Sequence, residues 1–235
     1  MVKIVQMMRF TPGLNRSEAY ERWFGPHAAL GRQVPGVRRY VQNAASAALH
    51  LVGIDPDRPT TFDGYSCVWF DGRAGFEAAT RSAEWAAVVA DGGTLFDATF
   101  EGAALTAVEE RLIVDGPVGP IKTVWFCRFP VAVRSDRVLI QASSNYWTET
   151  HGRGFGARVP GIGRYLQNHV IEPEPARRPP FDGFSECWFD DLATYEAMNV
   201  TPEWHAMNED AVTLFDRDLI VAGWSAALDE HVVVG

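Results

Sequence analysis

Residues 147–168 read WTETHGRGFGARVPGIGRYLQN, and residues 23–43 repeat this stretch as WFGPHAALGRQVPGVRRYVQN. Each copy holds a Trp and a His four residues apart, then Val-Pro-Gly, then Arg-Tyr, an apolar residue and Gln-Asn, and the spacer of the first copy is one residue shorter. A spacing of four residues places the Trp and the His on one face of a helix. Pro-Gly ends such a helix, and the β-prone run that follows predicts a strand.

The repetition continues in the same order along the whole chain. Residues 3–10 match 122–129, 62–71 match 181–190, 94–97 match 213–216, and 109–114 match 229–234. The chain is therefore a tandem duplication of units of about 115 residues, a typical size for a small domain. We place the units at 1–116 and 117–235, joined by the Gly- and Pro-rich stretch 115–120.

Each unit is predicted to run strand, helix, strand, strand, helix, strand. The expected strands are 2–10, 37–48, 63–70 and 103–113 in the first unit, and 121–129, 162–171, 182–189 and 222–234 in the second. The first helices are expected at 17–33 and 143–158, with a break at His27 because Pro26 precedes it. This order predicts an α+β fold of two ferredoxin-like (βαββαβ) units with antiparallel sheets. Helices cover one face of such a sheet, and two copies can bury their bare faces against each other.

Composition excludes several classes of protein. Of the 235 residues, 47% are hydrophobic and 22% are charged, as in ordinary globular proteins, and the net charge of −9 argues against a nucleic-acid partner. No apolar run is long enough to span a membrane, and the N-terminus lacks a signal-peptide pattern. The three cysteines are widely spaced and form neither a disulfide framework nor a zinc motif, so we expect a cytoplasmic protein.

Alternation along the third strand of each unit sorts candidate site residues into faces. Glu186 shares a face with Phe184 and Trp188, and the equivalent face of the first unit carries Tyr65, Cys67 and Trp69. A carboxylate buried among rings has a raised pKa, which suits acid/base chemistry. The alternative is a Glu at the rim of the sheet, held by an arginine such as Arg164.

The repeated stretch supplies further candidates. His27 and His151 share helix faces with Trp23 and Trp147, either as core histidines bonded to backbone carbonyls or as proton carriers. Tyr40 and Gln42, like Tyr165 and Gln167, share one face of the second strand. Facing an apolar cavity they would bind a carbonyl or a phenol, whereas at a rim they would be solvated. No metal-ligand spacing or phosphate loop accompanies these residues, so we expect neither metal nor cofactor.

Taken together, Trp-x-x-x-His, Val-Pro-Gly-x-x-Arg-Tyr-x-Gln-Asn, Phe-Asp-Gly-x-Ser-Glu-x-Trp-Phe-Asp and the closing Asp-x-x-x-Leu-Phe-Asp resemble the EthD family of the dimeric α+β barrel superfamily. The resemblance covers nearly all of both halves and implies an intramolecular pseudo-dimer whose two sheets close into one barrel. It also implies proton chemistry without metal by a His with acidic, Tyr or Cys partners, here His151, Tyr165 and Glu186. The first unit retains His27 and Tyr40 but has Cys67 where the family usually shows Glu.

These observations predict a cofactor-independent isomerase, cyclase or lyase that acts on a hydrophobic, oxygenated small molecule. His151 would carry the proton and Tyr165 would polarise a carbonyl, with Glu186 close enough to His151 for direct or one-water contact in a single cavity. Trp147, Gln167, Phe184 and Trp188 would line this pocket, and Trp23 and Trp69 are their counterparts in the first unit.

Several alternatives stay open. In one, Cys67 activated by His27 is the reactive group. In others, the protein is a non-catalytic small-molecule carrier or, with less support, a haem-binding barrel. Pairing of two pseudo-dimers is a further possibility, which the sequence does not decide.

Overall fold

In a computed structural model, residues 1–46, 61–171, 179–216 and 225–235 are described. The first unit comprises β1 (Val2–Met8), α1 (Arg16–Arg22), the π-helix η1 (Trp23–His27), α2 (Ala28–Gly31), β2 (Val37–Ala45), β3 (Gly64–Phe70), α3 (Arg73–Ala79), α4 (Ala83–Leu95), the short 3₁₀ helix η2 (Glu101–Ala103) and β4 (Thr106–Val114). The predicted order of elements is confirmed. The expected strand ends at 47–48 and 222–224 lie outside the described residues.

The second unit repeats this order with a longer first helix. It comprises β5 (Ile121–Cys127), α5 (Val131–Arg134), α6 (Arg137–Tyr146), the π-helix η3 (Trp147–Phe155), the short 3₁₀ helix η4 (Gly156–Arg158), β6 (Arg164–Val170), β7 (Gly183–Phe189), α7 (Leu192–Met198), α8 (Pro202–Leu214) and β8 (Ser225–Val234). The helix expected to start at 143 begins at Arg137, because the Asp136 side chain accepts hydrogen bonds from two backbone N–H groups of its first turn.

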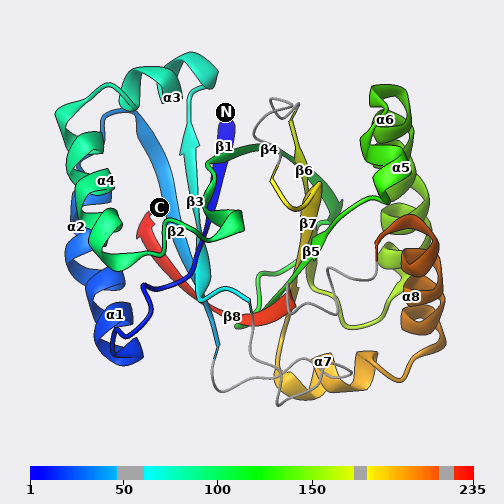
Figure 1. The fold of residues 1–235 in the computed structure, drawn as a ribbon. Helices are drawn as coiled ribbons and strands as arrows, with labels where there is room; N and C mark the ends of the chain where they lie inside the picture. The colour runs from blue at the N-terminus through cyan, green and yellow to red at the C-terminus, as the bar shows by residue number, and fades with distance from the viewer. Residues whose placement is uncertain (47–60, 172–178, 217–224) are drawn as a thin grey trace.

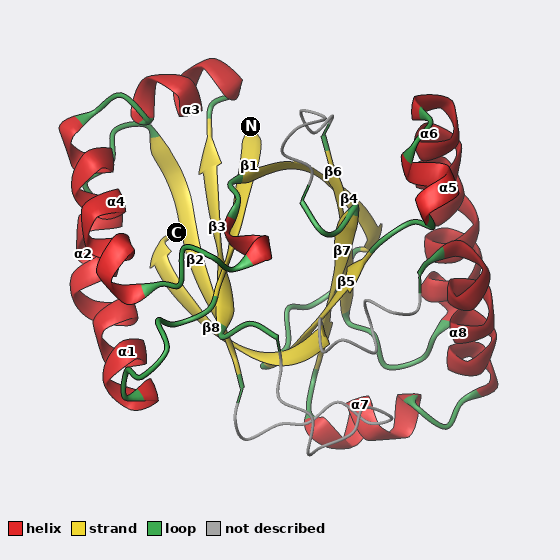
Figure 2. Cartoon of the chain, viewed as in Figure 1, coloured by secondary structure: helices red, strands yellow, loops and turns green. Residues whose placement is uncertain are grey.

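The eight strands close into one barrel in the order β1-β3-β2-β8-β5-β7-β6-β4. The fourth strand of each unit bridges to the other unit, since β4 pairs with both β1 and β6, and β8 pairs with both β5 and β2. The helices of the two units lie on opposite sides of this barrel (Figures 1 and 2). The predicted α+β barrel built from two ferredoxin-like units is therefore confirmed. Among the described residues, no helix is both long and apolar enough to cross a membrane.

Side chains of both units meet inside the barrel. Its main apolar cluster draws Val5, Tyr65 and Cys67 from the first unit and Phe126 and Phe184 from the second. The sheet faces that the helices leave bare are thus buried against each other, as the sequence predicts. Burial of apolar area, at about 25 cal/mol per Å², is the main force that holds the two units together.

The extra residue in the second spacer is taken up by the π-helices. The first unit has a five-residue π-helix, Trp23–His27, and the second a nine-residue one, Trp147–Phe155. A π turn accommodates additional residues without ending the helix, and such turns often occur at functional sites. The expected break at His27 is therefore wrong, because Pro26 lies within the π-helix and the chain continues as a helix to Gly31.

The Phe-Asp-Gly motif has a structural role in both units. The Asp63 carboxylate accepts from the Phe10 N–H at 2.7 Å, and Asp182 accepts from the Phe129 N–H at 2.9 Å, which ties the first strand's exit to the start of the third. A Cβ on the motif's glycine would lie 2.5 Å from the Asn43 carbonyl oxygen in the first unit. This position therefore requires glycine because the neighbouring strand and an indole pack against it.

Candidate functional site

His151 and Asp210 form a buried pair between the helices and the outer face of the sheet. The π-helix η3 presents His151, α8 presents Asp210, and the distance from His151 Nδ1 to Asp210 Oδ2 is 2.8 Å. An ionised carboxylate only accepts, so Nδ1 carries the proton and Nε2 keeps its lone pair. None of the described residues bonds Nε2. Burial lowers the pKa of His151 below its ordinary value, although Asp210 acts in the opposite direction. The imidazole is thus neutral near pH 7 with Nε2 available as a base.

A small apolar pocket adjoins His151. Its volume is about 60 Å³. Other residues that line it are Trp125, Cys127, Ser185, Cys187, Trp204, Met207 and Phe215. Ala211 and Asn208 complete the lining, so rings and sulfur atoms dominate this wall and its polar side chains are Ser185, Asn208 and His151. Such a surface suits the edge of a hydrophobic molecule that bears one oxygen.

Tyr165 lies behind this pocket and contacts it through Ser185. Its hydroxyl is 3.2 Å from Ser185 Oγ and accepts a hydrogen bond of 3.0 Å from Gln167 Nε2. Gln167 also donates to the Trp147 carbonyl at 2.9 Å, which links the strand to the π-helix. Because Gln167 donates to Tyr165, the phenol can donate to Ser185 and leave the serine proton free for the pocket. Burial raises the pKa of Tyr165, so the phenol is neutral.

The first unit contains the same arrangement with one added cation. His27 Nδ1 lies 2.8 Å from Asp91 Oδ2, and the pocket beside it, also about 60 Å³, is lined by Tyr40 and Ser66. Arg22 forms an ion pair with Asp91. Burial lowers the pKa of His27 and Arg22 lowers it further, while Asp91 opposes both. Gln42 bonds the Trp23 carbonyl and the Tyr40 hydroxyl, as Gln167 does its counterparts in the second unit.

Glu186 lies inside the barrel, on the opposite face of the sheet from His151. Its carboxylate is 3.0 Å from Lys3 Nζ and 2.8 Å from Lys122 Nζ, and it accepts from the Tyr65 hydroxyl at 2.8 Å and from Asn168 Nδ2 at 3.0 Å. Burial favours the neutral acid, but Lys122 and Lys3 outweigh it and lower the pKa of Glu186. The group is a fixed anion with filled acceptor sites, which makes it a poor general base.

The prediction that Glu186 and His151 share one cavity is therefore wrong. In β7, Ser185 and Cys187 border the His151 pocket, whereas Glu186 alternates to the other face. The structure brings together His151, Tyr165, Gln167 and Trp147 on the helix side, with His27, Tyr40, Gln42 and Trp23 as their counterparts. It places the remaining predicted residues, namely Cys67, Trp69, Phe184, Glu186 and Trp188, inside the barrel or at its mouth.

Cys67 occupies the position equivalent to Glu186 and stays protonated. Burial raises the pKa of its thiol to about 12, although Lys3 acts in the opposite direction. His27 cannot activate it, because the His27 ring lies on the outer face of the sheet and borders Ser66 and Val68 in the first pocket. A neutral, buried thiol is inert, so the interpretation of Cys67 as the reactive group loses its basis.

Sequence reasoning gave no site role to four important residues, although two of them, Asp91 and Asp210, begin the closing motif. Asp91 and Asp210 recur three residues before the matched Thr-Leu-Phe-Asp segments, and this repetition of an acidic residue was the available signal. Lys3 and Lys122 open the matched first strands, and a lysine that alternates in phase with Val5 or Val124 points inward. Within the described residues, no group of three or more His, Cys, Asp or Glu side chains could hold a metal ion.

Comparisons with known proteins agree with this architecture. No curated protein matches the sequence significantly. The crystal structure of an anthrone oxidase-like protein has a TM-score of 0.58 at 10% identity, covering 100% of this chain and 94% of that chain, which shows a shared fold. An EthD (ethyl tert-butyl ether D) family protein from Bacillus halodurans C-125 is 25% identical, covering 47% of this chain and 99% of that chain, with a TM-score of 0.34.

The family itself is shown by a model of the EthD domain, which matches residues 11–99 and 141–218. The two matches fall one in each unit, and together they span more than half of the chain. The chain belongs to the EthD family.

Proposed function

We propose that this protein is a cofactor-independent acid/base enzyme that acts on a hydrophobic, oxygenated small molecule at the His151 pocket. Isomerases, cyclases and lyases of this kind share one step, removal of a proton from a carbon beside a carbonyl group. The observation that carries the proposal is the buried His151–Asp210 pair, in which none of the described residues bonds Nε2 and the histidine lines an apolar pocket.

The arrangement supports a simple cycle. His151 Nε2 takes the proton from the carbon, and the electron pair of that C–H bond moves to the carbonyl oxygen as an enolate. The Ser185 hydroxyl donates a hydrogen bond to this oxygen, and Tyr165 and Gln167 hold the serine in place. Asp210 stabilises the imidazolium, which returns the proton to the substrate at the same or another carbon. General acid/base catalysis of this type contributes about 10²- to 10⁴-fold.

The size of the pocket restricts how a substrate enters. A volume of about 60 Å³ is well below the 300–1,000 Å³ typical of ligand sites, so a ring-sized substrate must displace wall side chains. Trp204 and Met207 belong to α8, the helix that also carries Asp210. A small outward shift of this helix would widen the pocket, and we expect substrate binding to require it.

Hydrogen–deuterium exchange tests the proposal without knowledge of the natural substrate. We would follow exchange at the carbon beside the carbonyl of α-tetralone in D₂O by proton NMR. The wild type is expected to exceed the buffer rate, and His151→Gln should lose about 100-fold or more of that excess. His27→Gln is the matched control and should change the rate by less than about threefold.

Two outcomes would contradict the proposal. Equal rates for wild type and His151→Gln would exclude His151 as the base. Tight binding of α-tetralone with exchange no faster than in buffer would favour the rival interpretation, a non-catalytic small-molecule carrier.

A further inference from the structure

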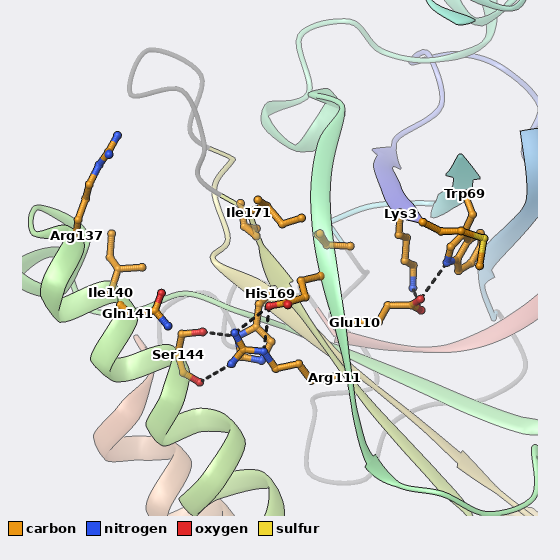
Figure 3. Close-up of a pocket in the computed structure, with 14 residues that line it drawn as sticks. Lys3, Trp69, Glu110, Arg111, Arg137, Ile140, Gln141, Ser144, His169 and Ile171 are labelled. Atoms are coloured by element: carbon orange, nitrogen blue, oxygen red, sulfur yellow. Dashed lines mark hydrogen bonds and ion pairs between the residues drawn. The ribbon is translucent and has the colours of Figure 1, made fainter. Parts of the chain in front are cut away.

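A second and larger cavity opens at the mouth of the barrel, away from the His151 pocket. Its volume is about 640 Å³, within the range of small-molecule sites. It reaches from Lys3, Trp69 and Glu110 across β4 to the outer side of the sheet, where Arg111 and His169 face α6. Figure 3 shows these two groups on either side of the β4 ribbon, with Ser144 and Ile140 on the helix opposite Arg111.

The two units carry different residues at equivalent positions, and these differences shape the side of the cavity that faces α6. Beside the helices of the second unit stand Ser144, Thr148 and Arg111 of the adjoining β4; the equivalent positions beside the helices of the first unit hold Tyr20, Phe24 and His231 of the adjoining β8. Those three rings pack together, with centroids 5.8 Å apart for Tyr20–Phe24 and 5.2 Å apart for Phe24–His231. Ser144 and Thr148 are smaller than Tyr20 and Phe24 and leave that volume open.

The charge of the cavity is opposite to that of the protein. The whole chain carries −9, yet the cavity is lined by Lys3, Arg111 and Arg137 against two carboxylates, Glu109 and Glu110. Glu110 is already committed, because it lies 3.3 Å from Lys3 Nζ and accepts from Trp69 Nε1 at 3.0 Å. Glu110 thus belongs to the ionic cluster of Lys3 and Glu186, and on the helix side Arg111 and Arg137 face one carboxylate, Glu109.

Arg111 is the centre of this cationic region. Its side chain is 24% exposed, whereas its carboxylate partner Glu109 is 58% exposed, and so much solvent weakens their ion pair. The other contacts of the guanidinium are neutral, namely the Thr148 hydroxyl at 2.9 Å and the Ser144 carbonyl at 3.4 Å. A mostly buried guanidinium with weak compensation favours an additional anion.

The neighbouring His169 adds neither charge nor a free ring nitrogen to the cavity, because both of its nitrogens have partners. Its Nδ1 lies 2.7 Å from Ser144 Oγ, and its Nε2 lies 3.2 Å from Gln167 Oε1. Burial and the nearby Arg111 lower the pKa of His169 to about 3, so it stays neutral. Apolar contacts come from Ile140, Val108, Val170 and Ile171 along the rest of the wall.

We propose that this cavity binds an organic anion with an apolar ring body, its carboxylate held by Arg111 and its rings against Ile140 and Ile171. The site is separate from the His151 pocket and does not depend on the proposed reaction. On the other side of the barrel the packed rings of Tyr20, Phe24 and His231 occupy the equivalent positions, so the site occurs only beside the helices of the second unit.

Titration calorimetry with naphthoate as the probe tests this site on the full chain. The wild type is expected to bind naphthoate, and Arg111→Met should weaken binding about 10- to 100-fold, as the loss of a charge-assisted bond predicts. The double variant Ser144→Tyr/Thr148→Phe restores the first unit's rings and should abolish binding. Arg153→Met removes an arginine that is exposed and lies outside the cavity, and it should leave the affinity unchanged.

An uncharged analogue tests whether Arg111 recognises the carboxylate, and one further variant tests whether the site is separate from the His151 pocket. Naphthylmethanol should bind the wild type at least about tenfold more weakly than naphthoate, and Arg111→Met should not change its affinity further. His151→Gln should keep full naphthoate affinity, whatever it does to proton exchange. The proposal is overturned if the wild type does not bind naphthoate, if Arg111→Met binds it equally well, or if His151→Gln loses it.

Discussion

The two His–Asp pairs differ in what else the carboxylate contacts. In the first unit, Arg22 forms an ion pair with Asp91, while at the equivalent position of the second unit Tyr146 donates a 2.6 Å hydrogen bond to Asp210. A guanidinium neutralises the carboxylate and lowers the pKa of the nearby His27, whereas a neutral phenol leaves the negative charge of Asp210 to support His151. Duplication has kept the His–Asp geometry twice and altered its electrostatics once.

The barrel interior differs more strongly between the units, because Glu186 faces two lysines and its counterpart Cys67 carries no charge. Replacing Glu186 with Gln leaves Lys3 and Lys122 without their shared anion, which should cost about 3–5 kcal/mol of unfolding free energy. Cys67→Ala should cost about 1 kcal/mol, as for a small buried deletion. Urea denaturation of both variants measures the contrast, and equal losses would refute the charge-based account.

Where the two units are alike, equivalent changes should have equal effects. A Cβ on Gly64 would lie 2.5 Å from the Asn43 carbonyl oxygen, and one on Gly183 would lie 2.4 Å from that of Asn168. We expect Gly64→Ala and Gly183→Ala each to lower the free energy of unfolding, measured by urea denaturation, by about 1–3 kcal/mol. Gly93 in α4 has no atom within 4 Å of such a Cβ, so Gly93→Ala should be stabilising by up to about 1 kcal/mol. A large difference between the first two variants would mean that the units pack unequally.

The free energy of unfolding at acid pH should respond differently to replacement of Glu186 and to replacement of Cys67. The pKa of Glu186 is lowered in the folded state, so its stabilisation is fully present above the unfolded value of about 4.3 and is lost as the pH falls toward the folded value. The stability difference between wild type and Glu186→Gln should therefore be constant from about pH 6 to 8 and shrink below about pH 4. The difference between wild type and Cys67→Ala should stay level over the same acid range. A constant gap for Glu186→Gln would contradict the lowered pKa.

The smallest expected effect concerns the second partners of the aspartates. Arg22→Gln should raise the pKa of His27, because the guanidinium disfavours the imidazolium. Tyr146→Arg should lower the pKa of His151 by introducing that cation into the second unit. NMR titration of the imidazole carbon signals measures both. Unchanged titrations in both variants would show that Arg22 and Tyr146 do not tune the two sites.

The sequence predicted the fold well because each structural element occurs twice in the same order. It also sorted Glu186 from Ser185 and Cys187 correctly by alternation. It did not reveal which face of β7 meets the helices, since all seven residues of that strand are buried and hydrophobicity cannot distinguish the two sides. The error in pairing His151 with Glu186 arose there.

The lysines were missed for a different reason. Lysine is usually exposed, and only a partner makes its burial tolerable. The partners of Lys3 are Glu186, Asn168 and Glu110, all more than 100 residues away in sequence. Local patterns cannot show such a contact, which depends on the closure of the barrel.

The covalent link between the units gives the molecule a freedom that a homodimer lacks. In a symmetric dimer every substitution appears twice, once on each side of the axis, so besides the equivalent Glu110 and Glu230 the lysine pair would face either two further carboxylates or none. Here β4 and β8 exchange partners across a single chain, and one carboxylate serves both lysines. Fusion of the two units therefore permits an odd number of charged side chains inside a nearly symmetric barrel. It also allows a residue to change in one unit while its counterpart in the other unit stays as it was.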